Sequence, residues 1–141
     1  MDLHLTKKQF RRLLDMAYIG NWVLNSARGQ DRFPDYDEVE SLLFGKAKEE
    51  GMTELSEYWA GEIVPSRKFV EGGIHEAIAD YEDAIFFDIL AEELARRDMD
   101  DVPIDESNFN ELARRMDAYM AEFEAHGTDH VLVEGDFNPE Q

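Results

Sequence analysis

Polar residues interrupt the apolar faces of two predicted helices, and they are the first candidates for a site. The set comprises Asn21, Asn25, Arg28, Asp88 and Glu92. At helical spacing, Asn21, Asn25 and Arg28 continue the apolar face of the first helix. Asp88 and Glu92 fall inside the apolar arc of a later helix. An unpaired charge there would cost several kcal/mol. Two interpretations stay open: a buried network in which Arg28 or Arg115 neutralises an acid, or a cleft that takes a ligand.

Two pairs of acidic residues have a spacing that suits a divalent cation. They are Glu54, Glu57, Asp80 and Asp83. Acids three residues apart project from one helix face, so two facing pairs can hold Mg²⁺ against a polyphosphate. The pattern resembles the ExxE…ExxD motif of the all-α nucleoside-triphosphate pyrophosphohydrolases, which implies a magnesium-dependent hydrolase. The sequence departs from that motif: Asp80 replaces a glutamate, and the first pair lies on a very short predicted helix.

The histidines match no established metal motif. His126 and His130 are four residues apart, but Gly127 interrupts the helix between them, so they need not share a face. The chain has no HExxH and no paired ExxH motif, which argues against zinc-protease and di-iron sites. We therefore expect surface histidines and no cofactor, with Mg²⁺ needed only under the hydrolase interpretation.

The elements that would position these residues are helical. Apolar spacing, Thr6, Pro34 and Gly51 predict long helices over residues 6–28, 34–50, 74–98 and 107–125, and a short helix over residues 54–59. This pattern predicts an all-α, single-domain bundle of four long helices plus one or two short ones. We expect an acidic bundle over residues 1–128 and an extended or mobile tail over residues 129–141.

The third long helix is predicted to be the centre of the bundle. From Phe86 to Leu90 it is apolar on most sides, and a helix of that kind is usually buried by several neighbours. Gly72 and Gly73 break helical propensity just before it, so the regular helix should begin near Ile74.

The charge of the chain restricts its partners. The 141 residues include 33 acidic and 14 basic ones, which gives a formal net charge of −19. Residues 69–95 contain eight acids and no lysine or arginine. Such a chain is a poor direct ligand for nucleic acid or an anionic membrane, but it suits a basic protein partner. Large aromatic residues on the first two helices also allow a homodimer.

The expected compartment is the cytoplasm. The chain has no cysteine and therefore no disulfide. No apolar run approaches the roughly 18–20 residues that cross a bilayer, and the first residues, MDLHLTKKQF, lack the apolar core of a signal peptide.

Two short segments resemble part of another group of proteins. They are residues 18–28, YIGNWVLNSAR, and LARRD at residues 94–98 after AIFF at residues 84–87. They resemble small conserved hypothetical bacterial and phage helical proteins without assigned activity. The resemblance implies a helical cytosolic protein and carries over no catalytic residue.

The sequence therefore favours one function and leaves one alternative. The favoured function is a non-enzymatic protein–protein interaction module that binds a basic or nucleic-acid-binding protein. The alternative is the magnesium-dependent nucleotide hydrolase.

Overall fold

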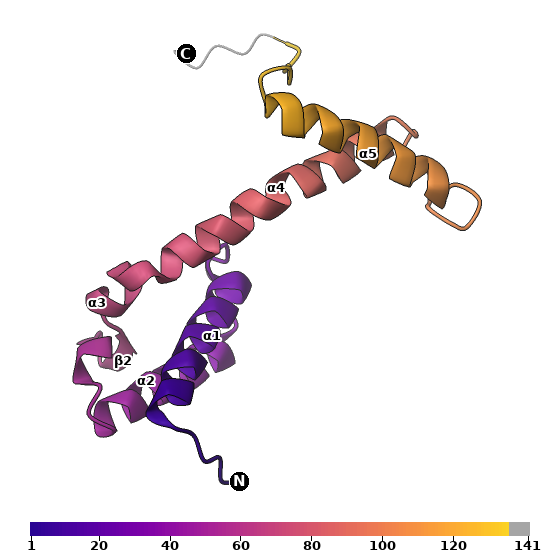
Figure 1. Ribbon diagram of the computed structural model, residues 1–141. Helices are drawn as coiled ribbons and strands as arrows, with labels where there is room; N and C mark the ends of the chain where they lie inside the picture. Colours follow the sequence, from indigo (N-terminus) through magenta and orange to yellow (C-terminus); the bar gives the residue numbers. More distant parts are fainter. Residues whose placement is uncertain (136–141) are drawn as a thin grey trace. The chain divides into compact units, whose positions relative to one another are not determined.

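A computed structural model describes residues 1–135 of the chain, and helices make up most of it (Figure 1). The long helices are α1 (Lys7–Asn25), α2 (Pro34–Glu49), α4 (His75–Arg97) and α5 (Phe109–His126). The shorter elements are η1 (Thr53–Leu55), β1 (Ser56–Trp59), β2 (Glu62–Pro65), α3 (Arg67–Phe69) and η2 (Val70–Ile74). None of the described helices has the length and apolar content needed to cross a membrane.

The chain divides into two compact units, and the boundary falls within α4. The first unit comprises Met1–Asp80, and the second begins at Tyr81. The expected division into a bundle over residues 1–128 and a tail from residue 129 stays a prediction. Val131, Leu132 and Val133 are exposed and belong to no strand, and residues 136–141 of the expected tail lie outside the described residues.

Local sequence signals account for where α1 and α2 begin. Thr6 and Gln9 form a capping box, in which each side chain bonds the other residue's backbone N–H. Pro34 occupies the first turn of α2, where its missing N–H costs nothing. The first helix was expected to reach Arg28, but it ends at Asn25, whose side chain bonds the backbone at Phe33.

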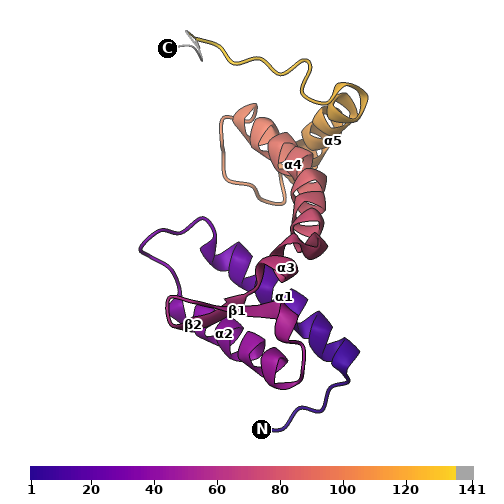
Figure 2. The same ribbon diagram turned by 90° about the vertical axis from the view of Figure 1, so that its left-hand side faces the viewer.

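The predicted short helix over residues 54–59 is wrong, because β1 and β2 form an antiparallel hairpin there (Figure 2). Ser56 pairs with Pro65 and Trp59 pairs with Glu62. Ala60 and Gly61 both have positive φ, 51° and 87°, as a tight two-residue hairpin turn requires. The fold is therefore dominated by helices without being purely α-helical.

The core of the first unit joins all its major elements. It comprises the buried residues Leu14, Tyr18, Phe44, Ala47, Leu55, Phe69 and Ile78. α1 packs on α2, and the hairpin packs on α2 as well (Figure 2). The ring of Phe69 contacts those of Phe44 and Tyr18 edge to face, at centroid distances of 4.9 and 5.4 Å. η2 leads into α4 through Gly73, which has a φ of 105°.

The second unit pairs the later part of α4 with α5. Ala91, Ala95, Leu112 and Phe123 are its buried residues, and the rings of Phe87 and Phe123 lie 5.2 Å apart. The expectation that several neighbours bury this helix is not met within the unit. Tyr81, Phe86 and Ile89 are 60%, 50% and 54% exposed, because α5 covers a different side of α4.

Removing the Leu14 side chain should test the core of the first unit. Leu14 is fully buried, whereas Leu42 on α2 is 70% exposed. We expect Leu14→Ala to lower the free energy of unfolding by about 2–5 kcal/mol. Leu42→Ala is the matched control and should cost less than about 1 kcal/mol. Urea denaturation followed by circular dichroism measures both values, and equal losses would contradict this core assignment.

Candidate functional site

Asn25 holds the end of α1 against the start of α2. Its side chain is 1% exposed and bonds the backbone of Phe33 at both groups: Nδ2 donates to the carbonyl, at 3.1 Å, and Oδ1 accepts from the N–H, at 2.8 Å. Nδ2 also donates to Oδ1 of Asn21, at 2.7 Å. Phe33 precedes α2 and has no capping side chain of its own. Asn25 therefore satisfies backbone groups that the connecting loop would otherwise leave unpaired.

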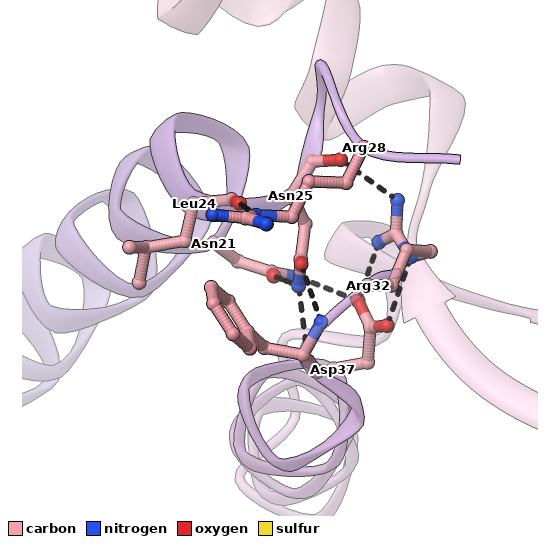
Figure 3. A network of polar contacts seen from close by, with 7 residues as sticks. Asn21, Leu24, Asn25, Arg28, Arg32 and Asp37 are labelled. Carbon is pink, nitrogen blue, oxygen red and sulfur yellow. Dashed lines mark hydrogen bonds and ion pairs between the residues drawn. The ribbon is translucent and has the colours of Figure 1, made fainter. Parts of the chain in front are cut away.

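The carboxylate of Asp37 on α2 accepts hydrogen bonds from two neighbouring side chains (Figure 3). Arg32 donates to both of its carboxylate oxygens, at 2.7 and 3.1 Å, and Asn21 Nδ2 donates to Oδ1 at 3.0 Å. The hydrogen bonds from Arg32 lower the pKa of Asp37, although burial opposes them. Arg32 also donates to the Asn25 carbonyl. This network fixes the loop between α1 and α2, and it leaves Asp37 already paired.

Glu40 lies close to Asp37 on the same helix but has no ion pair among residues 1–135. Burial raises the pKa of its carboxyl group from 4.5 to about 7, and repulsion from Asp37 acts in the same direction. A hydrogen bond from Asn21 and the charge of Arg32 counteract this only in part. Glu40 therefore changes its charge near neutral pH, unlike an ordinary surface glutamate.

Tyr18, Trp22 and His75 form an aromatic wall beside these groups. The Tyr18 hydroxyl and His75 Nε2 are 2.6 Å apart. The Trp22 ring stacks on Tyr18 with centroids 6.4 Å apart, and it meets His75 edge-on at 4.6 Å. Burial raises the pKa of Tyr18, and the nearby Glu40 raises it further. His75 is half-buried and hydrogen-bonded, so the expectation that every histidine lies on the surface is wrong for this residue.

These groups surround a cavity of about 310 Å³ within the first unit. Its lining residues are Tyr18, Asn21, Trp22, Asn25, Ser26, Arg32 and Glu40. We call this cavity the α1–α2 pocket. It combines one carboxyl group of raised pKa, a paired guanidinium group and an aromatic wall. Such a combination suits a polar ligand that carries a positive charge.

The predicted set of polar residues is brought together only in part. Asn21 and Asn25 bond each other and line the pocket. Arg28 instead lies at the surface, where it pairs with Asp31 at 3.1 Å and covers the ring of Phe33. Its predicted role as the neutralising partner of a buried acid is therefore wrong.

The acids expected opposite Arg28 belong to the second unit and have local surroundings there. Asp88 is exposed, and Glu92 pairs with Arg96 one turn away, at 2.6 Å. Arg115, the other expected partner, pairs with Glu111. Neither acid is a buried charge, since Asp88 is exposed and the side chain of Glu92 is 42% exposed.

The predicted magnesium-binding acids do not share the geometry that the motif requires. Glu54 lies in η1 and Glu57 in β1, so this pair does not project from one helix face. Asp80 and Asp83 do lie one turn apart on α4, so only the second pair keeps the predicted spacing on a helix. All four side chains are exposed. The hydrolase interpretation therefore loses the structural premise on which it rested.

Sequence reasoning missed Glu40, although a signal for it was present. Glu40 precedes Phe44 and Ala47 by four and seven residues, which puts a carboxylate on the buried face of α2. Tyr36 and Val39 at the start of the same helix are apolar but exposed, so its apolar residues alone do not mark its buried face. Arg32 and Asp37 carried no such signal, because their pairing depends on the path of the loop between the helices.

The Asn25 network should matter more to stability than the Arg28 ion pair. Asn25→Ala leaves the backbone N–H and C=O of Phe33 without these partners and should lower the free energy of unfolding by about 3 kcal/mol. Arg28→Ala removes a surface pair and should cost less than about 1 kcal/mol. Urea denaturation measures both. A larger loss for Arg28→Ala would place a buried charge partner at Arg28 after all.

Glu40 should make stability fall as pH rises towards neutrality. Folding raises its pKa from 4.5 to about 7, so the folded state holds the proton more tightly. The resulting stabilisation is complete below the unfolded-state pKa and is lost as pH rises through about 7. Glu40→Gln stays neutral and should remove this loss, whereas the exposed control Glu38→Gln should keep it. Unfolding free energies measured at several pH values test this, and parallel wild-type and Glu40→Gln curves would contradict it.

The chemistry of the α1–α2 pocket follows from the side chains that line it. The pocket can accept hydrogen bonds, donate them from Asn21 and Arg32, and exchange a proton at Glu40 near neutral pH. Comparison with known proteins gives no match: no family model, no curated protein and no solved structure matches this chain.

Proposed function

We propose that this protein is a non-enzymatic interaction module that binds a basic segment of a partner protein. The α1–α2 pocket takes a lysine or arginine side chain from that segment. The observation that carries this proposal is the position of Glu40, a half-buried carboxyl group in the pocket wall without an ion-pair partner among residues 1–135. A buried carboxylate is stable only when a cation or hydrogen bonds compensate its charge.

The neighbouring groups leave Glu40 as the one that can receive an incoming cation. Arg32 is bound to both oxygens of Asp37, so this arginine and this aspartate already neutralise each other. The stacked rings of Tyr18 and Trp22 add an aromatic surface, which attracts ammonium and guanidinium groups. A basic side chain can therefore lie along the rings and end at the Glu40 carboxylate.

The net charge of the chain supports a basic partner over a second copy. A formal charge of −19 attracts positively charged proteins at long range and accelerates their association. Two copies of the same chain repel each other instead. The proposal therefore favours a complex with another protein over a homodimer. It includes the cytoplasm as the compartment, since a chain without cysteine needs no oxidising environment.

Binding of a labelled lysine peptide tests the pocket directly. The probe is a short lysine-containing peptide in a Gly–Ser background, and its matched control carries norleucine in place of lysine. Fluorescence anisotropy should show saturable binding of the lysine peptide only. Affinity should increase from about pH 6 to about pH 8, because the ligand pairs with ionised Glu40 while lysine stays charged.

Matched variants separate pocket binding from general attraction to an acidic surface. Glu40→Gln and Glu38→Gln each remove one negative charge from α2, but only Glu40 lines the pocket. We expect Glu40→Gln to weaken binding by about tenfold and to abolish its pH dependence, while Glu38→Gln changes little. Equal effects of the two variants, or equal binding of the norleucine peptide, would overturn the proposal.

A further inference from the structure

Three potential metal ligands converge at the end of α5. Glu122 and His126 are four residues apart on the last turns of the helix, so they share a face. His130 returns to the same place: its Nδ1 lies 2.5 Å from Glu122 Oε1, and its ring centroid lies 4.2 Å from that of His126. One ligand atom from each residue lies within 4.8 Å of the other two.

The turn after α5 brings His130 back towards the helix. Gly127 ends the helix with a φ of 56°, and its N–H bonds the Phe123 carbonyl at 2.8 Å. Two further backbone bonds, from Asp129 to His126 and from Val131 to Thr128, close successive turns. From the sequence, Gly127 interrupts the helix, so the two histidines need not share a face. In the structure its turn instead allows their rings to approach each other.

We propose that Glu122, His126 and His130 form a binding site for a late first-row divalent cation such as Zn²⁺. Two imidazoles and one carboxylate are a ligand set that Zn²⁺ uses, with a water molecule in the fourth position. Ligand atoms around a tetrahedral zinc ion are roughly 3.4 Å apart. The three side chains reach that spacing by small rotations, which their partial exposure to solvent permits.

The ligand types predict which cations the site prefers. Imidazole nitrogen favours zinc, copper and nickel, whereas magnesium and calcium prefer oxygen ligands. The many surface carboxylates of this chain can bind Mg²⁺ weakly, but only this group among residues 1–135 combines histidines with an acid at close range. Selective binding of Zn²⁺ over Mg²⁺ therefore distinguishes this site from general attraction to the acidic surface.

The surroundings of the site show what a bound cation would connect. Glu122 and His130 also line a cavity of about 230 Å³ within the second unit, together with Val131 and Leu132 from the segment after the turn. Metal binding by His130 would tie that segment to α5. The cavity keeps one side of the cation open to a water molecule or a small ligand.

Calorimetric titration of the full-length chain, prepared without a histidine tag, tests the site. We expect Zn²⁺ to bind with one high-affinity site per chain and to raise the midpoint of thermal unfolding. His126→Ala and His130→Ala should each weaken binding by at least about tenfold, because losses in the second shell alone reach that size. Mg²⁺ should give neither the heat nor the thermal shift.

His4→Ala is the matched control, since His4 is exposed near the other end of the chain. It should bind Zn²⁺ as the unmodified chain does. Thermal unfolding without metal checks that the variants remain folded, and their exposed positions predict that they do. The proposal is overturned if the tag-free chain does not bind Zn²⁺, or if the substitutions at His126 and His130 leave the affinity unchanged.

Discussion

The first unit depends on the two hydrogen bonds between the Asn25 side chain and the backbone of Phe33. An asparagine amide can pair with the N–H and C=O of one residue at the same time, so a single buried side chain fixes the path of the loop. That path brings Arg32 to Asp37 and leaves Glu40 beside Tyr18 and Trp22. The pocket is therefore a consequence of how α1 ends.

The elements could be predicted from sequence where the signal was local. Thr6 and Pro34 marked the starts of α1 and α2, and Gly127 marked the end of α5. The hairpin was missed because Ala60 is an unusual residue for a turn with positive φ. The hydrogen bonds between the two flanking strands join residues on both sides of the turn. They offset the conformational cost of a positive φ at Ala60.

The candidate site was harder to predict, because its residues come together through tertiary structure. Asn21 and Asn25 were identified by helical phase and do line the pocket. The same logic misplaced Asp88, since an apolar arc on a helix does not ensure that another helix covers it. His130 was missed as a neighbour of Glu122 because a turn, rather than helical spacing, joins them. Hydrophobic periodicity predicts which face of a helix is apolar, but it does not predict which other element packs against that face.

The exposed apolar residues of α4 give the large negative charge a second physical role. Tyr81, Phe86 and Ile89 expose apolar surface within the second unit, and surfaces of this kind promote self-association. Mutual repulsion between highly charged chains opposes that association and keeps the protein dispersed. Near the isoelectric point, about 4.4, the repulsion disappears while the apolar surface remains. We therefore expect colloidal stability, as distinct from folding stability, to be lowest near that pH even where the folded structure persists.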